Sequence, residues 1–156
     1  MTDHVAKQIL DQVVTTCTGL STTGSNVYRS RVHTLIETGL PCLLIFARED
    51  IIEEDATGLQ TDGKKGNSYI FSLSIDAVEK DASETTAEAN LFEIRKEVQT
   101  AMEADLTLSG KCKDLWLVEA NFEDRTGSGD SPILSLMMVW NILYRVKQGA
   151  PSTVLT

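Results

Sequence analysis

The 156-residue sequence is poor in the residues that cross-link a chain or bind metals: three cysteines, three prolines and two histidines. The cysteines lie far apart and form no Cys-x-x-Cys pair, which excludes a disulfide scaffold and favours a reducing compartment. His4 and His33 stand alone, without the paired spacing that zinc sites use. With 42% hydrophobic and 24% charged residues, the composition predicts one globular domain.

Positive charge is also scarce. The chain has 14 Lys and Arg against 23 Asp and Glu, a formal net charge of −9. The excess lies in residues 41–110, which hold six basic and fifteen acidic side chains, whereas both flanks are balanced. Proteins that grip nucleic acids concentrate Lys and Arg to displace counterions from phosphates. The charge pattern therefore argues against a nucleic-acid-binding protein.

Signals for export or membrane insertion are lacking as well. The first residues show neither the basic nor the apolar stretch of a signal peptide. The longest mostly apolar stretch, residues 133–146, is interrupted by Ser135, Asn141 and Arg145. It is too short to span a bilayer. The sequence predicts a soluble, cytoplasmic protein.

Hydrophobic spacing predicts two helices and four strands. Apolar residues three and four positions apart favour a helix capped by Asp3 and another that begins at residues 81–84 with a capping box. Strands are expected over residues 42–47, 69–77, 116–122 and 134–146. These elements predict an α+β fold, a mostly antiparallel four-stranded sheet with both helices on one face. We expect one domain over residues 1–147 and a tail, 148–156, that is flexible or contacts a neighbour.

An acidic run follows the first predicted strand. Ile51 and Ile52 interrupt it and argue against a calcium loop, so it predicts a solvated or partner-facing edge. A polar, glycine-bearing excursion over residues 56–68 then predicts a mobile loop or hairpin tip. The acidic residues of the run are Glu49, Asp50, Glu53, Glu54 and Asp55.

Catalytic constellations are missing from the sequence. The lysine-containing stretch of residues 63–66 lacks the spacing of a phosphate loop. Asp62-Gly63-Lys64 matches the acidic-x-Lys triplet of metal-dependent nucleases, but that triplet belongs on a strand, and here it lies in a glycine-rich loop. We therefore expect a structural or interaction protein that is not an enzyme and uses no metal or cofactor, with a small metal-dependent nuclease as the alternative from another class.

Several stretches resemble the phage tail terminator family, the minor tail protein U-like proteins of long-tailed phages. Val27-Tyr28-Arg29-Ser30-Arg31, followed by Gly39-Leu40-Pro41 and an apolar strand, is similar to the start of the family's domain. The acidic run, residues 98–113 and the closing strand with Tyr144-Arg145 resemble the stretches that follow. The resemblance covers residues 5–147, and the excursion 56–68 and the tail 148–156 depart from the family pattern.

The resemblance implies a subunit that forms a ring, usually a hexamer, at the head-proximal end of a phage tail tube. There it would end tube polymerisation, contact the tail tube protein and the head–tail connector protein, and let double-stranded DNA pass without specific binding. It implies a virion location after assembly in the host cytoplasm and no membrane contact. Another head–tail connector or adaptor ring subunit is the nearer alternative.

Two sets of residues follow as candidates for this role. The acidic run, Glu49 first, would face the DNA channel and repel phosphates, or would instead solvate an outer wall and keep the protein soluble. Contacts between subunits or with the tube are expected from Tyr28, Arg29, Arg31, Lys64 and Lys65.

Overall fold

The computed structural model describes residues 2–29, 39–59, 63–125 and 133–155, with only the backbone for residues 54–59 and 124–125. In chain order, its elements are α1 (Val5–Cys17), β1 (Val27–Tyr28), β2 (Cys42–Leu59), β3 (Lys65–Lys80), α2 (Glu84–Glu103), β4 (Asp114–Arg125), β5 (Ile133–Lys147) and β6 (Ala150–Val154). The strands form one six-stranded sheet in the order β1-β2-β3-β5-β4, and β6 pairs with β5.

The α+β class and the two helices on one face are confirmed, whereas the four-stranded sheet is wrong. The sheet has six strands and is mixed, because β1 runs parallel to β2. β1 is only two residues long, too short for a hydrophobic period to appear in the sequence. β6 lies in the predicted tail and pairs Val154 with Val146 of β5. Contact of the tail with a neighbouring subunit stays a prediction.

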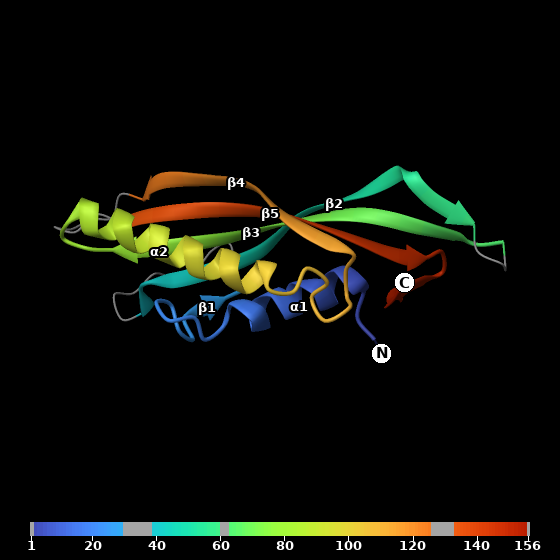
Figure 1. Ribbon diagram of the computed structural model, residues 1–156, viewed down its shortest axis with the longest axis horizontal. Coiled ribbons are helices and arrows are strands. Elements are labelled where there is room, and N and C mark those ends of the chain that lie inside the picture. The colour runs from blue at the N-terminus through green and yellow to red at the C-terminus, as the bar shows by residue number, and fades with distance from the viewer. Residues whose placement is uncertain (1, 30–38, 60–62, 126–132, 156) are drawn as a thin grey trace.

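The core lies between the helices and one face of the sheet (Figure 1). Val5, Ile9 and Val13 from α1 and Leu91 and Ile94 from α2 are fully buried there. From the sheet, alternate residues of β5, Leu134 to Val146, enter the same core. The predicted period of two along this strand is therefore confirmed. No described helix lies on the opposite side of the sheet, which we call the uncovered face, although Cys42, Leu44 and Val78 form a small buried cluster at one end of it.

β2 is the main departure from the predicted strands. It begins at Cys42 as expected but continues through the acidic run to Leu59. Antiparallel pairing with β3 continues there, with Asp50 opposite Phe71 and Glu53 opposite Ser68, because β3 begins at Lys65, four residues before the predicted start. The acidic run is thus part of β2, and residues 56–68, the predicted loop or hairpin tip, include the ends of both strands.

The N-caps of the two helices lie one and two residues after the predicted caps, Asp3 and Asp81. The His4 imidazole, not Asp3, caps α1 by accepting a hydrogen bond from the Ala6 N–H, with Nδ1 and N 3.1 Å apart. Ser83 caps α2 by accepting from the Thr86 N–H at 3.3 Å. Neither described helix is long and apolar enough to cross a membrane.

Candidate interaction surfaces

The long strands carry the sheet beyond the helices as a projection that we call the arm, formed by residues 49–59 of β2, 65–72 of β3 and 141–147 of β5, with β6 alongside (Figure 1). The N-terminus of α1 lies at the base of the arm, where the rings of His4 and Tyr144 meet edge to face with centroids 6.5 Å apart. On the helix side, Phe71, Ile142 and Tyr144 of the arm are still buried in the core, whereas residues 51–53 of β2 are exposed on both faces of the sheet.

A polar and aromatic contact holds the base of the arm. The Tyr144 hydroxyl donates a hydrogen bond to the Asp50 carboxylate, and the Tyr144 ring stacks on Tyr69 with centroids 5.3 Å apart. Partial burial raises the pKa of Asp50 above its ordinary 3.8, although the Tyr144 hydrogen bond and the nearby His4 oppose this shift. Burial, and then the Asp50 carboxylate, raise the pKa of the Tyr144 hydroxyl. The contact joins β2, β3 and β5 where the helices end.

Strand alternation divides the acidic run between the two faces of the arm. Glu49 and Glu53 pair with Ser72 and Ser68 of β3 and lie on the uncovered face. Asp50 pairs with Phe71 and lies on the helix side. The backbone of Glu54 and Asp55 belongs to β2, but their side chains lie outside the described residues. Whether these carboxylates face a DNA channel stays a prediction.

The arm also exposes apolar side chains that the sequence reasoning did not select as site residues. Ile51 is 52% exposed on the uncovered face and Ile52 is 50% exposed on the helix side. Ile51 lies in one cross-strand row with Ile70 and Leu143. The signal was present in the sequence as an apolar pair inside a charged run, but only the strand pairing shows that the two side chains point in opposite directions.

The predicted contact residues lie at two separate places. Tyr28 and Arg29 lie at β1 and just beyond it, and the Arg29 guanidinium forms an ion pair with Asp11 of α1. Lys64 and Lys65 are exposed at the turn between β2 and β3, at the tip of the arm. Arg31 lies outside the described residues. Contact of any of these residues with a neighbouring subunit or a tube stays a prediction.

The nuclease triplet is only partly visible. Gly63, with a φ of +79°, and Lys64 lie in the turn between β2 and β3, and Asp62 lies outside the described residues. Over residues 2–29, 39–59, 63–125 and 133–155, no group of three or more His, Cys, Asp or Glu side chains is arranged to hold a metal ion.

The sequence matches no protein-family model and no curated protein. Among solved structures, the chain is similar to one from the virion of a native gene transfer agent particle, with 14% identity and a TM-score of 0.39. The match covers 90% of this chain and 92% of that one. A similarity at this level assigns neither a family nor a function to the chain.

Proposed function

We propose that this protein is a ring-forming structural subunit of a phage-like virion that ends the tail tube at its head-proximal side. The observation that carries the proposal is the arm, a sheet extension with Ile51 and Ile52 about half exposed on opposite faces. Apolar side chains on both faces of a solvated projection are stabilised when a partner subunit covers them. The resemblance to tail terminators supplies the kind of assembly.

In such a ring, the arm reaches over the neighbouring subunit. A head-to-tail contact of this kind is heterologous, and it closes into a ring when the rotation between subunits allows. The uncovered face, with Glu49 and Glu53, is the side that we place toward the DNA channel, where carboxylates repel phosphates. A ring structure with both carboxylates on its outer wall would contradict this placement. The proposal assigns no catalytic role to the acidic residues.

The test is assembly of arm variants. We expect the purified protein to form rings visible by negative-stain electron microscopy, with a matching sedimentation coefficient at high concentration. Ile51→Glu and Ile52→Glu should each lower the fraction assembled several-fold, because each places a charge in an apolar contact. Leu106→Glu is the matched control, since Leu106 is 45% exposed but lies in the connection between α2 and β4.

Two results would count against the proposal. A wild-type protein that stays monomeric at the highest attainable concentration would exclude an intrinsic ring, and equal losses for Leu106→Glu and the arm variants would remove the special role of the arm. Immunogold labelling of virions distinguishes the finer roles. A label at the upper end of free tails favours a terminator, whereas a label only on heads favours a head–tail connector subunit.

A further inference from the structure

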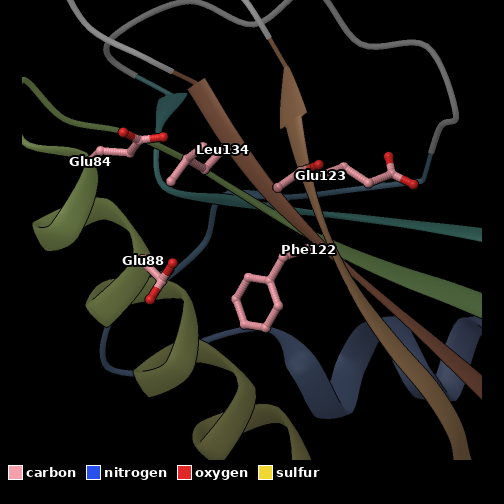
Figure 2. Close-up of a pocket in the computed structure, with 6 residues that line it drawn as sticks. Glu84, Glu88, Phe122, Glu123 and Leu134 are labelled. Carbon is pink, nitrogen blue, oxygen red and sulfur yellow. The ribbon is translucent and has the colours of Figure 1, made fainter.

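A groove lies between α2 and β4, the edge strand of the sheet. α2 packs on β3 and β5, so the helix side of β4 is only partly covered. Glu84, Glu88 and Phe92 are spaced four residues apart and form one stripe along α2. Figure 2 shows Phe122 of β4 pointing toward the helix, and the Phe92 and Phe122 ring centroids are 4.9 Å apart. A cavity of about 150 Å³ is lined by Glu84, Glu88, Phe122 and Leu134, with Glu123 and Ser135.

The groove exposes large apolar side chains. Phe92 is 50% exposed and Phe122 is 43% exposed, although their rings already contact each other. An aromatic pair with about half of its surface in water offers apolar area that a partner can bury.

The backbone of β4 is open on one side. β4 pairs with β5, and no other described strand pairs with it. None of the backbone hydrogen bonds between segments of the described chain reaches the outer edge of β4. The N–H and C=O groups along such an edge are a template for an added extended strand. The groove therefore combines an apolar floor with an unpaired strand edge.

Charge indicates what the groove accepts. Glu84 and Glu88 are like charges one helical turn apart, a spacing that costs α2 a small amount of stability. Within the described chain, neither carboxylate has a cation at ion-pair distance. Past Phe92 the helix carries both signs of charge, because Arg95 and Lys96 lie among Glu93, Glu97 and Glu103. The groove is thus acidic only near the N-terminus of α2.

The acidic residues of β4 itself disfavour pairing of this edge with a second copy of the chain. Antiparallel pairing of β4 with another β4 would bring together strands that each carry Asp114, Glu119 and Glu123. Like charges opposite each other destabilise a sheet. A basic partner strand is favoured over self-pairing.

We propose that the groove between α2 and β4 binds an extended segment of a partner protein in which an apolar residue and a lysine or arginine lie two positions apart, on the same face of the added strand. The segment adds a strand to the outer edge of β4 and places an apolar side chain on Phe92 and Phe122. The basic side chain two positions further along the segment points to the same side and lays its stem along Phe122 and its charge against Glu84 and Glu88. The groove lies at the opposite end of the molecule from the arm (Figure 1), so the inference does not depend on the ring contact.

The test uses two short, end-blocked peptides as probes: in one, pairs of valines alternate with pairs of lysines, so that both residue types lie on each face of an extended strand, and in the other, glutamate replaces lysine. Trp116 of β4 is 38% exposed, whereas Trp140 is fully buried, so Trp116 fluorescence reports on the edge. We expect saturable binding of the lysine peptide that weakens as salt is added, and no binding of the glutamate peptide.

Variants locate the binding. Glu84→Gln combined with Glu88→Gln should weaken the lysine peptide about tenfold, because each lost carboxylate removes a charge-assisted contact. Glu49→Gln combined with Glu53→Gln removes the same charge from the arm and should leave the affinity unchanged. Phe122→Ser should also weaken binding, and the signal of buried Trp140 checks that each variant is folded.

Three results would overturn the proposal. Equal binding of both peptides would remove the charge selection, and equal losses in the groove and arm variants would show only an effect of net charge. The protein could instead self-associate as its concentration rises. If Phe122→Ser abolishes this self-association and the lysine peptide does not inhibit it, the groove belongs to a second copy of this chain. If the groove variants lose peptide binding but still assemble into rings, binding in the groove and ring contact through the arm are independent.

Discussion

At the scale of single residues, a side chain's role depends on the face to which its strand turns it. Asp50 and Glu53 belong to one acidic run, yet Asp50 accepts a hydrogen bond from Tyr144 on the helix side while Glu53 lies on the uncovered face. The pKa of Asp50 is raised because its carboxylate is partly removed from water at the base of the arm. Two acidic side chains of one run therefore differ in their surroundings: Asp50 accepts a hydrogen bond at the base of the arm, and Glu53 is exposed on the other face.

Asp50 makes stability depend on pH. The pKa of Asp50 is higher in the folded protein than in the unfolded chain, so the folded protein binds this proton more tightly. Protonated Asp50 therefore contributes stability that is present at low pH. We expect the free energy of unfolding to fall as pH rises from about 3.8 through the raised pKa, and Asp50→Asn to lose this component. Urea titrations from pH 3 to 7 measure it.

Glu53→Gln is the control for the loss of one charge from the same strand. Parallel stability curves for wild type and Asp50→Asn over the whole pH range would show that burial does not penalise the Asp50 carboxylate.

At the scale of elements, local signals located the helices well and their caps less well. The sequence pattern offered Asp81 as the cap of the second helix, but Ser83 caps α2 and Asp81 accepts a hydrogen bond from the Ser83 N–H at 2.8 Å. In β4, a bulge between Leu117 and Glu119 shifts the alternation. Trp116 and Phe122 are six residues apart, a separation that places both on one face of a regular strand, but the bulge puts Trp116 on the uncovered face and Phe122 on the helix side. One extra residue in a strand is enough to reverse every side chain on one side of it.

The cap of α2 is testable by one substitution. Ser83→Ala should lower the free energy of unfolding by about 1 kcal/mol, because the Thr86 N–H loses its acceptor at the helix start. Chemical denaturation followed by circular dichroism measures the loss. Thr85→Ala, at an exposed position of the first turn, is the control and should change stability by much less. Equal effects at both positions would mean that Ser83 does not act as the cap.

At the scale of the whole molecule, the two ends of the chain are packed together. β6 pairs with β5 and contacts α1, since the Gln8 side-chain amide donates to the Ser152 carbonyl at 2.9 Å. Val154 packs against the core, and the Leu155 N–H donates to the Arg145 carbonyl. The last residues therefore pair with the edge of β5 that faces away from β3, at the base of the arm.

Removing residues 150–156 tests this packing. We expect the truncated chain to stay folded but to lose about 1–2 kcal/mol in the free energy of unfolding, because Val154 and the β6 ladder are gone. A lower midpoint in urea denaturation would show it, and removal of Thr156 alone serves as the control. An unchanged midpoint would show that β6 does not stabilise the isolated protein.

The candidate site was less predictable than the fold. The sequence indicated the acidic run and the lysines of the turn, but not the exposed pair Ile51 and Ile52 or the contact between Phe92 and Phe122. Phe92 and Phe122 are thirty residues apart in sequence, and no local period reports that α2 lies beside β4. A residue's exposure depends on which neighbours cover it, and those neighbours come from distant parts of the chain.

Local sequence patterns were sufficient for the two helices, for the strands rich in alternating apolar residues and for the α+β class. They suffice because the periods of helices and strands depend only on the spacing of apolar residues that are close in sequence. Tertiary pairing alone decided the rest: the length of β2, the parallel strand β1, the return of β6, and the division of the acidic run between two faces. A strand formed by charged residues is stable only where another strand offers its backbone hydrogen bonds, and that partner, β3, lies further along the chain.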